Sequence, residues 1–140
     1  MTVINADGLI LGRMASAIAK RLLLGEEIVV INAQKAVVSG KKDMVIRKWK
    51  GFLDVGGRRG PFHQRHPDRI VRRTIRGMLP YRKGSGRNAM RLLRVHVGVP
   101  REFRNVKVGT IEDARLDRLK CKFVTLGELA KEIGYTGQNA

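Results

Sequence analysis

The chain has 140 residues, and its hydrophobic fraction of 43% is ordinary for a globular protein and argues against wholesale disorder. Its 29 Lys and Arg residues far outnumber its 12 Asp and Glu residues, so its net charge is +17. The sequence contains no apolar run near the ~20 residues of a membrane span, no signal-peptide pattern and only one cysteine, Cys121. We therefore expect one cytoplasmic domain over residues 1–140, without disulfides, whose partner is a polyanion rather than a membrane.

The N-terminal third has the pattern of a βαβ unit. Residues 2–5 are expected to form a strand, residues 12–24 a helix that ends at Gly25, and residues 27–33 a second strand. The run Ile28–Ile31 is apolar at successive positions, which is typical of a parallel strand covered on both faces. Strand, helix and strand within about 30 residues predict parallel pairing.

The next elements are less regular. Residues 36–38 are expected to form a short strand or an extended connector. A helix should follow Gly40–Lys42, with its inner face formed by Val45, Ile46, Trp49, Phe52 and Leu53. A Gly-rich basic loop, residues 56–61, comes after this helix.

The segment from Arg58 to Arg94 holds 12 of the cations but only one acid, Asp68, and eleven of these cations are arginine. Two stretches in it have helical spacing, joined by the Pro/Gly connector 80–86. In the first stretch the inner positions are Ile70, Val71, Thr74, Ile75, Met78 and Leu79, and the outer ones are Arg65, Arg69, Arg72, Arg73 and Arg76. In the second, Ala89, Met90 and Leu93 form a narrow apolar stripe, and a basic face is formed by Arg87, Arg91 and Arg94.

A face of one sign, made almost entirely of arginine, differs from an ordinary solvated surface, which mixes charges and favours Lys and Glu. Guanidinium groups bind phosphate oxygens two at a time, so we interpret this face as a nucleic-acid surface, with a merely soluble charged face as the alternative. The seven aromatic residues are too scattered for a base-stacking sheet, and Trp49 and Phe52 are assigned to the core. Recognition should therefore depend on phosphates and shape.

The C-terminal part is expected to add short elements. Residues 95–99 are typical of a strand ended by Pro100, residues 101–110 look irregular, and Leu116 and Leu119 indicate a short helix. A last strand at residues 123–124 should lead into a helix that is capped by the Thr125–Glu128 capping box and stopped by Gly134. Together these elements predict a three-layer α/β/α domain with a small, four-stranded, largely parallel sheet, to which the basic helical and loop segment is added.

Three motifs resemble functional sites, but each lacks residues that the corresponding site requires. The turn Gly8–Arg13 lacks the spacing of a dinucleotide-binding loop, and Ser39–Lys42 lacks the residues of a P-loop. The pair His63 and His66 offers two metal ligands without a third. No nucleophile, base or paired carboxylates form a catalytic set. We therefore expect that the protein is not an enzyme and has neither a cofactor nor a metal site.

Several ordered motifs resemble one ribosomal family. In the N-terminal half they are Asp7-Gly8, Leu11-Gly12-Arg13, Ala15-Ser16, Val29-Val30-Ile31-Asn32-Ala33 and Gly40-Lys41-Lys42; the central ones are Pro67-Asp68-Arg69-Ile70, Arg76-Gly77-Met78-Leu79-Pro80 and Gly86-Arg87. The chain is similar over about residues 2–100 to the universal large-subunit ribosomal protein family numbered thirteen. The short link at residues 25–27 and the lack of a long C-terminal extension resemble the archaeal members. Residues 101–140 match bacterial members poorly.

The resemblance implies a four-stranded parallel sheet and a structural, non-catalytic role in translation. It also implies contacts with large-subunit ribosomal RNA and neighbouring ribosomal proteins in the cytoplasmic ribosome, and early entry into subunit assembly. The alternative is a free RNA-binding translational regulator that binds messenger RNA, as some relatives do. Together with the charge pattern, the resemblance predicts RNA-binding residues at Lys41, Lys42, Arg58, Arg59, Arg65, Arg69, Arg72, Arg73, Arg76, Arg82, Lys83, Arg87, Arg91 and Arg94.

Overall fold

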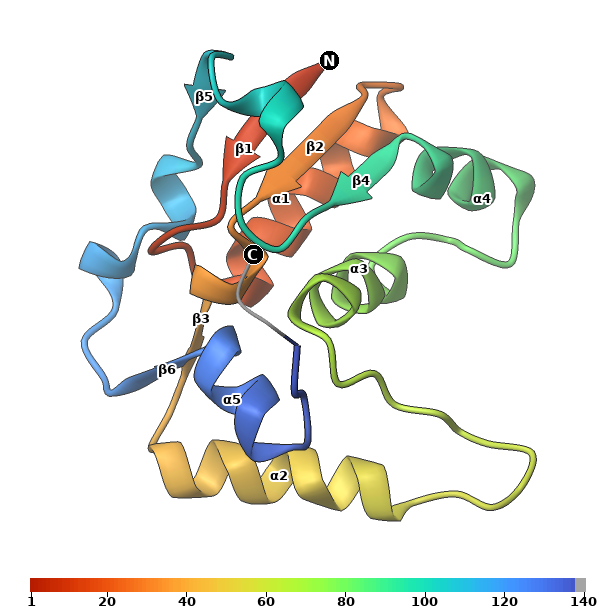
Figure 1. Cartoon of the computed structure of the whole chain (residues 1–140). Helices are drawn as coiled ribbons and strands as arrows, with labels where there is room; N and C mark the ends of the chain where they lie inside the picture. Colours follow the sequence, from red (N-terminus) through yellow and green to blue (C-terminus); the bar gives the residue numbers. More distant parts are fainter. Residues whose placement is uncertain (138–140) are drawn as a thin grey trace.

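The computed structural model describes residues 1–137, which fold into strands and helices around a shared core (Figure 1). In chain order these are β1 (Thr2–Asn5), α1 (Leu11–Leu23), β2 (Ile28–Ile31), β3 (Val37–Ser39), α2 (Lys42–Asp54), α3 (Pro67–Gly77), α4 (Gly84–Arg91), β4 (Leu93–Val95), β5 (Val108–Gly109), β6 (Phe123–Thr125) and α5 (Leu126–Glu132). Short 3₁₀ turns connect them: η1 (Ala33–Lys35), η2 (Arg101–Phe103), η3 (Glu112–Ala114) and η4 (Leu116–Arg118).

Within residues 1–137, four strands form a parallel sheet in the order β4-β2-β1-β5. β2 lies between β4 and β1, and all four of its side chains are buried, as its continuous apolar run predicted. β3 and β6 pair separately as an antiparallel ribbon in which Val38 lies opposite Val124. This second pairing was not predicted, because the two strands are only three residues long and lie far apart in the sequence, so no local pattern indicates that they pair.

The two faces of the parallel sheet are covered by different parts of the chain. Alternate side chains of a strand point to opposite faces. Ile28 and Val30 belong to the large core cluster that includes Ile18 of α1 and Ile75 of α3. Val29, together with Val3 and Ile31, packs instead against Phe103 of η2. The predicted three-layer α/β/α arrangement is confirmed, with a single 3₁₀ turn and its flanking chain as the thinner outer layer (Figure 1).

An ion pair fixes the short link between α1 and β2. Gly25 has φ +87°, the left-handed conformation expected at a helix end, and α1 ends one residue earlier than predicted. Glu26 accepts hydrogen bonds from Arg21 at 2.5 and 2.7 Å and from the Thr2 hydroxyl at 2.5 Å. These donors, Arg21 first, lower the pKa of Glu26 to about 2. The link therefore connects the end of α1 to the first residues of both central strands.

The Asn32 position explains why an asparagine follows β2. Its backbone has φ 56°, a left-handed conformation that Asn tolerates better than most residues. Its side-chain amide donates to Asn5 Oδ1 at 3.0 Å, and its backbone N–H donates to Gly98 O at 2.9 Å. Gly98 N–H in turn donates to Gln34 Oε1 at 3.0 Å. Asn32 thus ends β2 and holds the chain that follows β4.

The prediction of a strand at residues 95–99 was wrong in its boundaries. The strand β4 begins at Leu93 and ends at Val95, and His96 N–H makes the last contact of this strand with Val30 O, at 2.8 Å. Beyond His96 the chain leaves the sheet, because Gly98 binds the turn after β2. α4 accordingly ends at Arg91, and Arg94 lies on a strand rather than on the predicted helix.

The prediction of an irregular stretch over residues 101–110 was wrong, because it contains η2 and the sheet strand β5. The other C-terminal predictions are closer. β6 and η4 occupy the predicted positions of the last strand and the short helix. The Thr125 hydroxyl accepts a hydrogen bond from Glu128 N–H at 3.3 Å, which confirms the predicted N-cap of α5. Gly134 has φ +106° just beyond the end of α5.

Candidate nucleic-acid interface

Helix α3 divides into an apolar and a basic face. It begins at Pro67, whose missing N–H costs nothing at the first helical position, and Asp68 lies in its first turn. Its predicted inner residues Ile70, Val71 and Ile75 are buried. Its outer arginines, Arg69, Arg72 and Arg76, are exposed, and Arg73 is half-buried.

The inward position predicted for Met78 is wrong, since 44% of this residue is exposed. The helix ends at Gly77, so residue 78 no longer follows helical spacing, whereas Leu79 turns back into the core.

Helix α4 is held against the end of the connector that follows α3. Gly86 is buried, and a Cβ at this position would overlap the Pro80 carbonyl and lie 2.7 Å from Tyr81 N. Only glycine therefore fits between α4 and this connector. The close approach sets how α4 presents Arg87 and Arg91, both of which are exposed.

Four arginines of α3 line one hollow of about 210 Å³. The hollow lies where α3 meets α4 and the segment before α3, and its walls are formed by Gln64, Arg69, Arg72, Arg73, Arg76 and Met90. We call it the arginine hollow. Guanidinium groups that converge on one small space favour an oxyanion with several oxygens, such as phosphate.

Hydrogen bonds to the protein backbone hold two of these arginines in place. Arg72 donates to Leu93 O at 2.8 Å and to Met90 O at 3.3 Å, so it joins α3 to β4 and to the last turn of α4. Arg73 donates to the carbonyl of Phe62. Each guanidinium carries five N–H donors, so both retain donors for an anion.

Arg69 and Arg76 are held less firmly. Arg76 lies over the ring of Tyr81, with its guanidinium carbon 5.1 Å from the ring centroid, a cation–π contact. Arg69 makes no side-chain hydrogen bond or ion pair to any residue within 1–137. The arginine hollow thus combines two fixed and two adaptable guanidinium groups.

The loop between α2 and α3 carries two further predicted cations at its tip. Gly57 and Gly60 exchange backbone hydrogen bonds of 3.2 and 3.1 Å, so Arg58 and Arg59 form a two-residue turn. Both are exposed, and the loop extends away from the rest of the molecule (Figure 1).

The remaining predicted residues lie at different distances from the arginine hollow. Arg65 lies beside Gly134 at the end of α5. Arg82 and Lys83 are exposed in the connector that leads to α4. Lys41 and Lys42 are exposed at the start of α2, separated from the loop by the whole 13-residue helix, about 20 Å. The structure therefore does not bring these two lysines to the arginine hollow.

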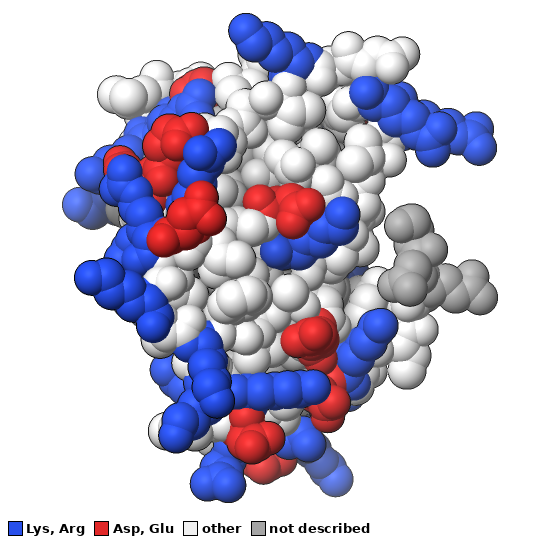
Figure 2. Space-filling model, turned by 90° about the vertical axis from the view of Figure 1, so that its left-hand side faces the viewer, with Lys and Arg blue, Asp and Glu red and all other residues white. Residues whose placement is uncertain are grey.

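None of the predicted cations is paired with an acid in the part of the chain that the structure describes. The ion pairs found there involve other cations, and two of them, Arg115–Glu112 at 3.1 Å and Arg118–Asp113 at 2.9 Å, lie in the C-terminal segment. Figure 2 shows the side of the molecule that bears this segment, where blue and red residues are interspersed. The unpaired cations and the mixed-sign surface thus belong to different regions of the chain.

His63 and His66 each contact an aromatic ring. The ring of His63 stacks on Phe52 with centroids 5.5 Å apart, and His66 packs edge-on against Tyr135 at 4.8 Å. Residues 1–137 contain no cluster of three or more His, Cys, Asp or Glu side chains suited to a metal ion. Among the same residues, no helix combines the length and apolar character needed to cross a bilayer.

The assignment of Phe52 to the core was wrong, since this ring lines a second hollow. Phe52 is 38% exposed, whereas Trp49 packs partly buried against the core. Their rings meet edge-on at 5.9 Å, and with His63 they line a space of about 180 Å³ between α2 and α3. The spacing of three between Trp49 and Phe52 indicated that they share a helix face, but His63 joins them from a loop that has no periodicity.

The fold and this surface define a basic α/β protein whose α3 arginines converge on one small hollow. Comparison with known proteins identifies its family. The family model described as "Ribosomal protein L13" matches residues 1–102. The chain belongs to this ribosomal protein family.

Three similar proteins from archaea match almost the whole chain. The chain is 50% identical to "Large ribosomal subunit protein uL13" of Archaeoglobus fulgidus over 139 residues, covering 97% of this chain and 89% of that protein. It is 47% identical to the protein of the same name from Methanosarcina barkeri over 137 residues, and 45% identical to that from Methanococcoides burtonii over 136 residues. Each of these two matches covers 96% of this chain and 98% of the relative. The resemblance to archaeal members is confirmed, and it extends through the C-terminal segment beyond the family model.

Proposed function

We propose that the protein is a structural constituent of the large ribosomal subunit that binds large-subunit ribosomal RNA through the arginines of α3, α4 and the 57–60 turn, which we call the arginine surface. In this proposal residues 1–140 act as one domain in the cytoplasmic ribosome, and the RNA-binding segment is 58–94. The protein needs no cofactor and catalyses no reaction; it holds RNA helices together early in assembly and contacts neighbouring ribosomal proteins. The observation that carries the proposal is the arginine hollow, in a chain whose family and relatives are ribosomal.

The geometry of α3 supports RNA over a small anion. Arg69 and Arg76 are seven residues apart, about 10 Å along the helix axis. Arg87 and Arg91 extend the positive surface onto α4, and the arginine pair of the 57–60 turn extends it onto the loop. A surface of this length suits a polyphosphate backbone, whereas one free phosphate would occupy the arginine hollow alone.

The salt dependence of RNA binding tests this proposal. If six to ten cations contact phosphates of large-subunit ribosomal RNA, a plot of log K against log salt should have a slope of roughly −4 to −9. For the double variant Arg69→Ala/Arg76→Ala the slope should be shallower by about 1.4 to 1.8, because the loss of each phosphate contact reduces the number of released counterions by ~0.7 to 0.9. The matched control Arg115→Ala/Arg118→Ala should keep the parent slope. A slope near zero for the parent protein would contradict an electrostatic RNA surface.

The alternative of a free translational regulator has weaker support. The names of the relatives concern the large ribosomal subunit, and none concerns messenger RNA. Stoichiometric presence of the protein in purified large subunits supports the structural role, whereas its absence there would favour the regulator. A nucleotide-dependent enzyme would instead require saturable binding of a mononucleotide.

A further inference from the structure

A second, largely apolar hollow adjoins the arginine hollow. It lies between α2, α3 and the segment before α3, measures about 180 Å³, and is lined by Trp49, Phe52, His63, Gln64, Ile70, Arg73 and Thr74. We call it the aromatic hollow. For scale, an apolar cavity of about 150 Å³ holds a benzene molecule, so this space is large enough for a planar ring system.

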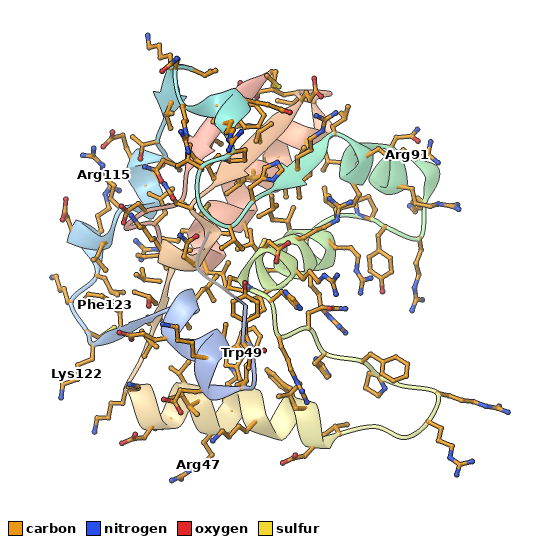
Figure 3. All side chains as sticks on the ribbon, in the orientation of Figure 1. Arg47, Trp49, Arg91, Arg115, Lys122 and Phe123 are labelled. Carbon is orange, nitrogen blue, oxygen red and sulfur yellow. The ribbon has the colours of Figure 1, made fainter. Side chains whose placement is uncertain are left out.

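Three aromatic rings form its wall. Phe52 and His63 lie nearly parallel, at 19°, and Trp49 meets Phe52 edge-on. In Figure 3 the side chain of Trp49 points from α2 toward the body of the molecule, whereas that of Arg47 points the opposite way. Phe52 is an exposed apolar ring beside this space, which is unusual for an aromatic residue on a helix that packs against a core.

Two residues belong to both hollows. Gln64 and Arg73 line the arginine hollow and the aromatic hollow alike. The hydrogen bond from Arg73 to the Phe62 carbonyl holds the segment that carries His63 and Gln64 against α3. A ligand that fills both spaces therefore has a planar aromatic part next to an anionic part, which is the composition of a nucleotide.

We propose that the aromatic hollow holds one unstacked base of the bound RNA while the adjacent phosphate occupies the arginine hollow. This inference rests on the proposed function and adds a base contact to a surface otherwise expected to read phosphates. Aromatic rings stack on any base, and the Gln64 amide offers both a donor and an acceptor to a base edge. The Thr74 hydroxyl donates to Ile70 O at 2.9 Å, which leaves its oxygen free to accept from a base.

Trp49 provides the signal for a direct test, because it is the only tryptophan of the chain. The probes are a short single-stranded oligoadenylate and an abasic ribose-phosphate oligomer of the same length. The oligoadenylate should change the Trp49 emission on binding and should bind roughly five- to a hundredfold more tightly than the abasic oligomer, the range expected for one aromatic stack. The abasic oligomer should bind with a steep salt dependence and leave the emission unchanged.

Substitution of the stacking ring separates the base contact from the phosphate contact. Phe52→Leu removes the ring but keeps an apolar side chain, and it should bring the affinities for the two oligomers within about twofold of each other. The control is Phe123→Leu, which replaces an exposed ring on β6, on the opposite side of the molecule from Arg91, and should leave the difference unchanged (Figure 3).

Each outcome bears on one of the two proposals. Equal, salt-dependent affinities for both oligomers with constant Trp49 emission would overturn the base contact and leave the arginine surface intact; the aromatic hollow would then suit an aromatic side chain of a protein neighbour. Salt-independent binding of both oligomers, or no binding, would overturn the phosphate surface itself. A preference for oligoadenylate that survives Phe52→Leu would overturn Phe52 as the ring on which the base stacks.

Discussion

Replacing Arg72 by alanine should lower both the stability of the protein and its affinity for RNA, whereas replacing Arg69 should lower RNA affinity alone. The two arginines lie one helical turn apart on the same exposed face of α3, and both line the arginine hollow. They differ in one respect. Arg72 donates to the carbonyls of Leu93 and Met90, and Arg69 has no hydrogen-bonded partner within residues 1–137.

The expected loss of stability in Arg72→Ala arises because the carbonyls of Leu93 and Met90 lose their hydrogen-bond donor. Leu93 is 2% exposed and begins β4, an edge strand of the parallel sheet, so few other groups replace the lost donor. A hydrogen bond to a charged donor contributes about 1.5–3 kcal/mol when buried, and less here because Arg72 itself is exposed. Relief of like-charge repulsion returns about 0.2–0.5 kcal/mol. We expect a net loss of about 1 kcal/mol, or roughly 3–5 °C in melting temperature for a domain of this size.

Thermal unfolding and RNA binding should be measured on the same preparations. Arg69→Ala is expected to unfold within about 2 °C of the parent protein, since surface substitutions usually change stability by less than ~0.5 kcal/mol. Both variants should show a shallower salt dependence of RNA binding. Equal melting temperatures for the Arg72 and Arg69 variants would refute the structural role of Arg72. A destabilised Arg69→Ala variant with normal RNA binding would refute the assignment of α3.

Three further substitutions test the supporting structure. Gly86→Ala should destabilise the protein by ~1–3 kcal/mol in urea unfolding, because the new methyl group overlaps the backbone of Pro80. The control Gly84→Ala should be neutral or stabilising, because no atom lies within 4 Å of its new Cβ. Ile31→Asp puts a carboxylate into the small core that packs against Phe103. Burial of an unpaired charge costs several kcal/mol, out of a total free energy of unfolding of ~5–15 kcal/mol. The variant should therefore fail to fold, which would be seen as loss of cooperative melting. Glu26→Gln should lower stability by at most ~1 kcal/mol at neutral pH, because the pair is one-third exposed. Because the pKa of Glu26 is lowered from 4.5 to about 2, its contribution to stability is complete above about pH 4.5 and is lost as the pH falls toward about 2. The difference in melting temperature between the parent protein and Glu26→Gln should therefore shrink only below about pH 4.5.

The elements that sequence could predict are those whose signal is local. β2 is a continuous apolar run, and α3 alternates buried aliphatic and exposed arginine positions at helical spacing. The Thr125 cap and the glycine at position 25 are likewise short-range signals. Each was found within about two residues of its predicted place because a few neighbouring residues determine it.

The elements that were missed depend on contacts between distant residues. The boundaries of β4 are set by Gly98, which binds the turn after β2 about 65 residues earlier. The aromatic hollow depends on His63, a ring that comes from a loop, and the backbone contacts of Arg72 depend on where α4 ends. Charge composition showed that α3 presents arginines, but it does not distinguish an arginine that also holds the fold from one that is free for RNA.

The central claim is that the arginine surface attaches this protein to the large ribosomal subunit, and incorporation into subunits in cells tests it most directly. Two tagged variants, each lacking four cations, would be expressed beside the untagged parent protein, and large subunits would be separated by sedimentation. The first variant replaces exposed arginines whose side chains donate no hydrogen bond to another helix or strand: Arg69, Arg76, Arg87 and Arg91. The second replaces exposed cations of the mixed-sign surface: Arg115, Arg118, Lys120 and Lys122. Figure 3 shows Arg91 on the opposite side of the molecule from Arg115 and Lys122.

We expect both variants to melt within a few degrees of the parent protein. Only the first should be depleted at least tenfold from the large-subunit fraction, since each lost phosphate contact weakens RNA binding. Equal incorporation of both variants, or selective loss of the second, would contradict the account.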